Sequence, residues 1–221
     1  MRLEARGAQV LAPRNKSSRL ARNARGQGDL LRIALLDAAE ALLDEVGVVD
    51  GLSLRRVTGR AGVTPNALYL HFSDLDALIV ALQTRSFAQL SAVLTTAEGE
   101  HDGDPRRQLL AMSEAYCEFA RRRPAIYRLL FGTYVGGARI VPREAAERAA
   151  ADDDVGVGTF NRLVEAVSRC LGTGHDPFAP AVEVWCLLHG YASLQPVMPA
   201  FPFPPRERFL GEAIGALLRG A

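Results

Sequence analysis

Apolar residues recur at helical spacing along most of the chain, and no strand pattern is found beyond residue 98. Asp29 is a candidate N-cap for a first helix, whose apolar face comprises positions 31, 35, 38, 39, 42 and 46. Ser73 is expected to cap a long helix over about 74–97. Further helices are expected at about 105–121, 125–132, 142–151, 155–171, 178–195 and 205–219. The pattern predicts an all-α fold, with a three-helix helix-turn-helix head and a larger helical body.

Residues 53–72, SLRRVTGRAGVTPNALYLHF, predict two short helices joined by a glycine turn. The Ser53 hydroxyl can accept from the free amides at the start of the first helix. Gly62 can adopt the left-handed conformation that ends it. Thr64 is expected to cap the second helix, with Pro65 at its first position. Two helices across such a turn form a helix-turn-helix, whose second helix enters the major groove of DNA.

Polar residues on the outer side of these two helices are candidates for contacts with DNA. Asn66 could read adenine through a bidentate contact, or it could hydrogen-bond its own backbone. Tyr69 and His71 are expected to contact phosphates or to support the residues that contact DNA. Arg55 and Arg56 either neutralise phosphates or form a solvated basic face. Leu54, Val57, Ala61, Val63, Leu68 and Phe72 are expected to bury between the helices. The candidate DNA-binding residues are Ser53, Arg55, Arg56, Thr64, Pro65, Asn66, Ala67, Tyr69 and His71.

The stretch from Leu35 to Leu78, LLDAAEALLDEVGVVDGLSLRRVTGRAGVTPNALYLHFSDLDAL, resembles the amino-terminal signature of the TetR family of bacterial repressors. The residues that match fill the first helix, the second helix, the turn and the recognition helix. Asn66 departs from the small residue that is common at this position in the family. Leu75 departs from a common lysine that touches a phosphate. The resemblance implies a homodimer that binds a palindromic operator and is released by a small molecule.

Two body segments extend the resemblance. RRRPAIYRLLFG at 121–132 and WCLLHG at 185–190 look like the carboxy-terminal domain of a TetR subgroup named for its Trp-His-Gly motif. That resemblance implies an effector pocket and a dimer interface, which we expect at helices 178–195 and 205–219. An apolar pocket would suit a lipophilic or aromatic effector, although aromatics at helical spacing also form plain core. The candidate pocket residues are Met112, Tyr116, Phe119, Tyr127, Phe131, Trp185 and His189.

Charge is unevenly distributed along the 221 residues. The net charge is +1, but residues 1–28 contain seven basic residues against Glu4, which leaves −5 for the remainder. This basic segment is expected to be disordered in the free protein. It is either an arm that contacts DNA or a solvated tail. A basic segment at one end of a mildly acidic body is typical of a protein that touches DNA there.

Three cysteines, Cys117, Cys170 and Cys186, are far apart and odd in number, which favours a reducing, cytoplasmic setting. The absence of an apolar run near ~18 residues favours a soluble protein without a membrane span. Cys186 and His189 have a spacing that could hold a metal, but a zinc site needs further ligands. Packing in the core is the favoured interpretation, and neither a metal nor a cofactor is expected.

These patterns predict a basic arm at 1–28, a DNA-binding domain at 29–73 and an effector-binding and dimerisation domain at 74–221. The favoured function is a repressor released from its operator by an effector. An activator or an effector-independent regulator is an alternative. A helical enzyme that uses His71, His189 or a cysteine is less favoured, because no acid–base–nucleophile set has a diagnostic spacing.

Overall fold

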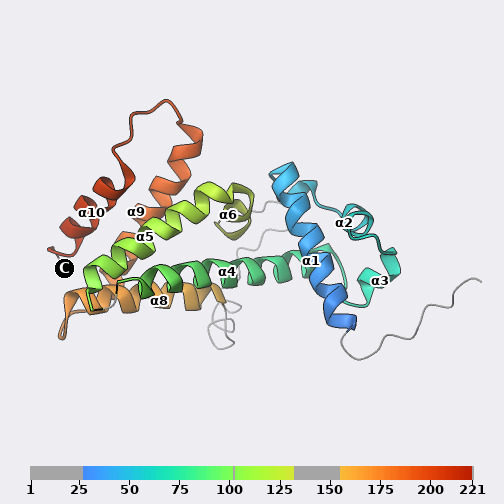
Figure 1. Cartoon of the computed structure of the whole chain (residues 1–221), viewed down its shortest axis with the longest axis horizontal. Coiled ribbons are helices and arrows are strands. Elements are labelled where there is room, and N and C mark those ends of the chain that lie inside the picture. The colour runs from blue at the N-terminus through green and yellow to red at the C-terminus, as the bar shows by residue number, and fades with distance from the viewer. Residues whose placement is uncertain (1–26, 102, 132–154, 221) are drawn as a thin grey trace, which may run out of the picture.

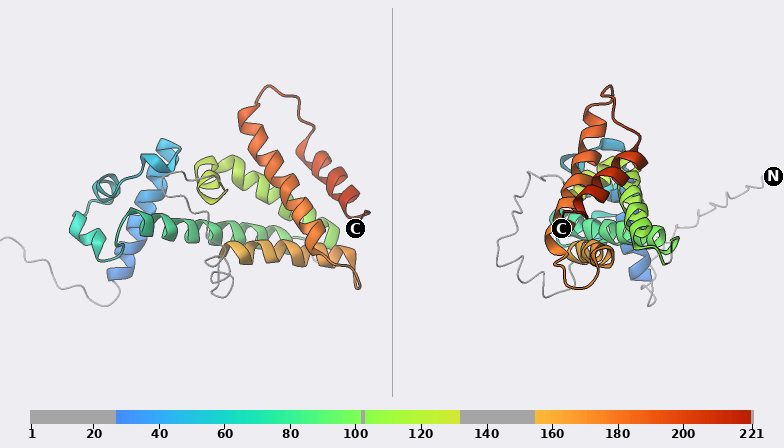
Figure 2. Two further views of the ribbon diagram at one scale, coloured as in Figure 1. Left: turned by 180° about the vertical axis from the view of Figure 1, so that it is seen from behind. Right: turned by 90° about the vertical axis from the view of Figure 1, so that its left-hand side faces the viewer.

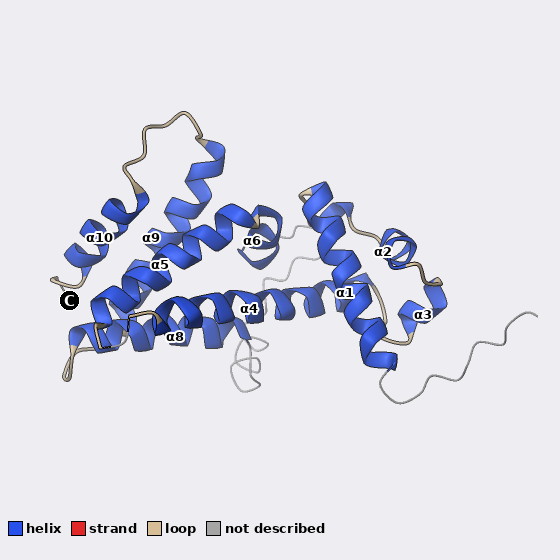
Figure 3. Cartoon of the chain, viewed as in Figure 1, coloured by secondary structure: helices blue, strands red, loops and turns tan. Residues whose placement is uncertain are grey.

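The computed structural model describes residues 27–101, 103–131 and 155–220, and all the secondary structure in these ranges is helical. The expected helix at 142–151 and the basic segment at 1–26 lie outside them. Figures 1 and 3 show the elements. They are α1 (Gln27–Val46), η1 (Val49–Gly51), α2 (Leu54–Ala61), α3 (Pro65–Tyr69), α4 (Leu75–Gly99), α5 (Pro105–Arg122), α6 (Pro124–Phe131), α8 (Val155–Leu171), α9 (Phe178–Val197) and α10 (Arg206–Leu217).

The head and the body lie at opposite ends of an elongated molecule, and the long helix α4 connects them (Figure 1). α1, α2 and α3 form the head. In the body, α5 packs against α4 and α8 on one side and against α9 and α10 on the other (Figure 2). The short helix α6 lies between α5 and the head, where it packs against α1 and α4. The predicted all-α architecture is confirmed.

Local capping explains where several helices begin and end. The Ser53 hydroxyl accepts from the Arg56 amide at 3.3 Å, and Gly62 ends α2 with a φ of 68°. The Asp104 carboxylate accepts from the Arg107 amide at 3.1 Å, with Pro105 at the first position of α5. The predicted Ser53 cap and the predicted end of the helix at Gly62 are confirmed.

Two predicted N-caps are wrong. α1 begins at Gln27, so Asp29 lies in its first turn, where a negative charge stabilises the helix dipole. At α4 the cap is Asp74, whose carboxylate accepts from the Ala77 amide at 2.7 Å. Ser73 donates its hydroxyl to that carboxylate at 3.0 Å. An ionised carboxylate accepts more strongly than a hydroxyl, which explains why the aspartate takes the cap position.

Buried aliphatic side chains hold each part together. Leu35, Leu43, Val57 and Leu68 are fully buried in the head, and Phe72 is nearly so. Leu54, Ala61 and Val63, which were also expected to bury, are half-buried. The body core is built from buried side chains of α4, α5, α6, α8, α9 and α10, among them Leu82, Leu90, Leu109, Ile126, Val167, Val184 and Leu210.

By length and composition, α4 is the one helix in the described ranges that could cross a membrane. Its Leu78, Leu82 and Leu90 are fully buried against neighbouring helices. Of the apolar stretch that meets this criterion 33% is buried, and the core helix of a soluble protein can meet it as well.

Candidate functional site

The helix-turn-helix presents a short recognition helix on a rigid support. Leu68 is fully buried and anchors α3 to the head. The Thr64 side chain makes no capping hydrogen bond, whereas its backbone carbonyl accepts from the Ala67 amide at 3.0 Å. Asn66 and Tyr69 are exposed on the outer side of α3. The arrangement leaves these two side chains able to reach a ligand outside the protein.

The other candidate DNA-binding residues differ in how available they are. Arg55, Thr64 and Pro65 are exposed, while Ser53, Ala67 and His71 are half-buried. The exposed Arg56 donates from its guanidinium to the Gly51 carbonyl at 2.6 Å, which ties it to η1. Arg55 is therefore the freer of the two adjacent arginines to meet a phosphate.

Sequence reasoning missed two features of this surface. Leu70, directly after α3, is 75% exposed beside Tyr69 and adds an apolar group to the face. Arg60 pairs with Glu45 at 2.5 Å, which fastens the end of α2 to α1. An exposed salt bridge of this kind contributes little stability.

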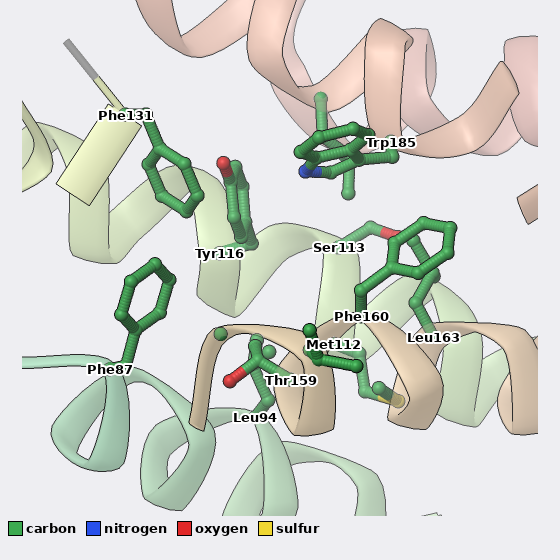
Figure 4. A pocket seen from close by; sticks show the side chains of 13 residues that line it. Phe87, Leu94, Met112, Ser113, Tyr116, Phe131, Thr159, Phe160, Leu163 and Trp185 are labelled. Atoms are coloured by element: carbon green, nitrogen blue, oxygen red, sulfur yellow. The ribbon is translucent and has the colours of Figure 1, made fainter. Parts of the chain in front are cut away.

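The body contains a cavity of about 400 Å³ between α4, α5, α6, α8 and α9 (Figure 4). Four of the predicted pocket residues line it, namely Met112, Tyr116, Phe131 and Trp185. Phe119, Tyr127 and His189 do not. The residues that sequence reasoning missed are Phe87, Leu94, Ser113, Gly156, Val157, Thr159, Phe160, Leu163 and Leu188. The described lining is mostly apolar and carries no charged side chain, which suits an uncharged lipophilic molecule.

Three polar side chains meet at the cavity wall, where Tyr116 lines the cavity and Tyr127 and His189 do not. The Tyr127 hydroxyl lies 2.7 Å from Nδ1 of His189. The Tyr116 hydroxyl lies 3.1 Å from Nε2 and 3.3 Å from Nδ1 of the same ring. Burial lowers the pKa of His189 and raises the pKa values of both tyrosines. The cluster is therefore uncharged at neutral pH.

Cys186 contradicts the prediction that it packs in the core, because it is exposed on α9. α9 is apolar almost all the way round, so hydrophobic periodicity did not show which of its faces is buried. Among the described residues no group of three His, Cys, Asp or Glu side chains is placed to hold a metal ion.

The outer side of α9 carries exposed apolar and small residues. Leu194 and Val197 are 46% and 72% exposed, and Gly190 is exposed between them and Cys186. A Cβ atom at Gly190 would meet nothing within 4 Å. The surface is open enough for another helix to approach closely.

Charged contacts connect the head to the body. Glu40 of α1 pairs with Arg85 of α4 and with Arg123, between α5 and α6. Arg85 also pairs with Asp37 at 2.6 Å. In α6, Arg128 donates two hydrogen bonds to the Gly47 carbonyl, at 2.8 and 3.2 Å. The end of α1 is thus attached to the helix that also supplies Phe131 to the cavity.

Comparison with known proteins agrees with this two-part arrangement. Residues 35–82 match the family of bacterial regulatory proteins named after TetR, and residues 109–217 match the tetracycline repressor-like C-terminal domain. The HTH-type transcriptional regulator YobS of Bacillus subtilis is 31% identical over 93 residues. That alignment covers 42% of this chain and 47% of YobS, so the chain spans about half the length of this curated relative.

Solved structures extend the similarity to nearly the whole fold. A protein of Rhodococcus sp. RHA1 is 25% identical with a TM-score of 0.69, over 92% of this chain and 98% of that one. The regulator FadR of Bacillus subtilis, solved in complex with stearoyl-CoA, has a TM-score of 0.64 at 12% identity. It covers 86% of this chain and 98% of its own, and at that identity it shows the fold alone. With both family matches in chain order on one helical fold, the chain belongs to the TetR family of transcriptional regulators and carries that family's DNA-binding domain.

Proposed function

We propose that the protein is a cytoplasmic, homodimeric repressor that leaves a palindromic operator when a small uncharged molecule fills the body cavity. One observation carries the effector-controlled part of the proposal. In α6, Phe131 lines the cavity while Arg128, three residues earlier, holds the Gly47 carbonyl at the end of α1. A single short helix therefore touches both the cavity and the DNA-binding head.

The coupling follows from this shared helix. A ligand that displaces Phe131 would move α6, and with it the hydrogen bonds from Arg128 to the head. The ion pairs of Arg85 and Arg123 with Glu40 give the same junction a second connection. The ligand can shift the head only by as much as its affinities for the two arrangements differ. We expect the arrangement that fits the operator to bind the ligand less tightly.

Operator binding is assigned to α3, with Asn66 and Tyr69 as the outward-facing side chains. In a two-fold dimer, the two recognition helices would enter successive major grooves about 34–36 Å apart, or a multiple of this distance. Arg55 would neutralise a flanking phosphate. α1 begins close to His71, since a Cβ atom at Gly28 would lie 3.7 Å from Cε1 of that ring. We therefore assign the basic segment before it to contacts with DNA beside α3.

Dimerisation is assigned to α9 and α10. The exposed Leu194, Val197 and Gly190 would be covered by the same helices of a second copy. A stable dimer usually buries ~1,200–2,000 Å² in total. An apolar surface that is left open in one copy is a recognised mark of such an interface. We also assign the chain to the Trp-His-Gly subgroup, on Trp185, His189 and Gly190 in α9.

The cavity assignment is supported by the fold of FadR from Bacillus subtilis, whose structure holds stearoyl-CoA. A lipid-like ligand therefore occurs in a regulator with this architecture. The described cavity wall of the present chain offers no basic side chain for the phosphates of such a ligand. We accordingly assign an uncharged lipophilic or aromatic effector in place of an acyl-CoA.

The test is binding of the purified protein to DNA upstream of its own gene and of the neighbouring gene. Titrations at two salt concentrations are compared with a random duplex. Saturable, sequence-selective binding that weakens steeply with salt is expected, because cations released from phosphates drive part of the affinity. Equal binding to both duplexes at either salt would contradict operator recognition. A reporter assay with and without the gene distinguishes repression from activation.

A further inference from the structure

The hydroxyl groups of the described cavity wall differ in whether their hydrogen bonds are already made. Ser113 is buried and donates its hydroxyl to the Leu109 carbonyl at 2.7 Å. Thr159 is also engaged within the protein. The Tyr116 hydroxyl has only the longer contacts with the Tyr127–His189 pair. Among the hydroxyl groups of the described wall, that of Tyr116 is therefore the one whose hydrogen-bonding capacity is least used.

The contacts of Tyr116 cannot all be good hydrogen bonds. Its hydroxyl is nearly equidistant from the two nitrogens of His189, at 3.1 and 3.3 Å, but those nitrogens point in different directions within the ring plane. One hydroxyl can align with only one of them. Nδ1 is already 2.7 Å from the Tyr127 hydroxyl, and the contact between the two tyrosine hydroxyls is 3.5 Å long. The Tyr116 hydroxyl can therefore still donate its hydrogen to, or accept a hydrogen bond from, another partner.

We propose that Tyr116 is the residue that selects the effector, by hydrogen-bonding a hydroxyl group on an uncharged aromatic ligand. This inference rests on the proposed cavity. Figure 4 shows the Tyr116 hydroxyl between the rings of Phe131 and Trp185, where a flat ligand would lie against aromatic side chains. Edge and face contacts of this kind favour an aromatic ligand.

A hydroxyl on the ligand fits either protonation pattern of the cluster. If Tyr127 donates to Nδ1 of His189, then Nε2 carries the hydrogen and Tyr116 can donate to the ligand. If Nδ1 donates to Tyr127, then Tyr116 donates to Nε2 and accepts from the ligand. A hydroxyl can accept in the first case and donate in the second. A charged ligand group would lose its hydration without gaining an opposite charge from the described lining.

Two probes of similar shape test the assignment by equilibrium dialysis on the full-length protein. 2-Naphthol carries a hydroxyl where 2-methylnaphthalene carries a methyl group. Tyr116→Phe should weaken 2-naphthol binding by ~2–12-fold, the usual range for one net hydrogen bond. It should leave 2-methylnaphthalene within about twofold. Tyr191→Phe is the matched control, because Tyr191 is buried against Phe209, outside the cavity, and should change neither probe.

The other outcomes separate this inference from the function on which it rests. An equal change for both probes in Tyr116→Phe would overturn the selecting role while the cavity remained a ligand site. Tighter binding of 2-naphthoate, or of a naphthylmethyl-trimethylammonium cation, would overturn the preference for an uncharged ligand. If the wild-type protein binds no probe, the cavity fails as an effector site, and this inference fails with it. Operator binding would still be judged by its own titration.

Discussion

Arg128 and Gly47, 81 residues apart in sequence, are joined by two hydrogen bonds from one guanidinium to one backbone carbonyl. Gly47 follows the last residue of α1 and has a φ of 75°, so its carbonyl lies at the C-terminal end of that helix. A cation at this end is favoured by the helix dipole. The body thus contacts the head where the head's supporting helix ends.

Arg128→Ala should loosen this connection without unfolding either part, since Arg128 is exposed. Hydrogen exchange followed by mass spectrometry should show faster exchange at Gly47 and the following turn. In the wild-type protein, 2-naphthol is expected to weaken operator binding. In Arg128→Ala this weakening should be ~2–30-fold smaller, the range found for residues that carry part of a coupling energy. Arg121→Ala is the control, because in the described part of the chain Arg121 pairs with Glu118 of the same helix, α5, and with no residue of the head. If 2-naphthol weakened operator binding equally in Arg128→Ala and in the wild type, the Arg128–Gly47 contact would not couple the cavity to the head.

Asn66→Ala should cost ~1–3 kcal/mol on the operator and relax the preference at one base pair, because a bidentate base contact is lost. The measurement is a titration against the operator, its single-base variants and a random duplex. Asn161→Ala is the matched control, since Asn161 is exposed on α8, in the body. An equal loss on operator and random DNA would show that Asn66 does not read a base.

Gly62 and Gly59 should respond in opposite ways to alanine. Neither would bring a new Cβ within 4 Å of another atom, so steric crowding does not distinguish them. Gly62 has a φ of 68°, and alanine there should destabilise the head by ~1–2 kcal/mol. Gly59 lies inside α2, where alanine should stabilise by up to ~1 kcal/mol. Urea unfolding of the two variants checks the signs, and a stabilising Gly62→Ala would contradict the left-handed cap.

His189 should make stability depend on pH in the weakly acidic range. Burial lowers its folded pKa below the ordinary value of 6.5. As pH falls through 6.5, the unfolded chain takes up a proton that the folded protein resists, so the free energy of unfolding falls. The loss continues until the folded pKa is reached. Above 6.5 the contribution is constant.

Comparison with His189→Asn isolates this contribution from the other histidines. Asparagine places a polar group near the position of Nδ1, so contact with Tyr127 can be retained. Urea unfolding at several pH values should give a difference between wild type and variant that changes only below about pH 6.5. A constant difference across that range would show that His189 does not resist protonation in the folded protein.

Gly190→Arg should convert the dimer to monomers. An arginine there meets open space in a single copy but would be buried between the two α9 helices of the proposed dimer. Sedimentation velocity should show at least a tenfold higher dissociation constant, which corresponds to ~1.4 kcal/mol. Gly158→Arg is the control, because Gly158 is an equally open helical glycine on α8. Retention of the dimer in Gly190→Arg would place the interface elsewhere.

The sequence by itself determined the helices and the turn of the head, because those features depend on neighbours within four residues. The Ser53 cap reaches only to Arg56, and the left-handed turn is set by the glycine at position 62. A local signal was also misread at the start of α4, where Ser73 was predicted as the N-cap. The adjacent Asp74 is the stronger acceptor and takes that position. Even there the error in the start of α4 was a single residue.

Only the tertiary structure decided which side chains meet across the body. Phe87 and Phe160 reach one cavity from α4 and α8, whereas the predicted Phe119 does not line it. Cys186 lies on the exposed side of α9, which the sequence pattern did not show because this helix is apolar on nearly every face. Helical periodicity shows which residues share a face, but the partner of that face depends on how several helices pack together. The cavity and the Arg128–Gly47 link arise from that packing.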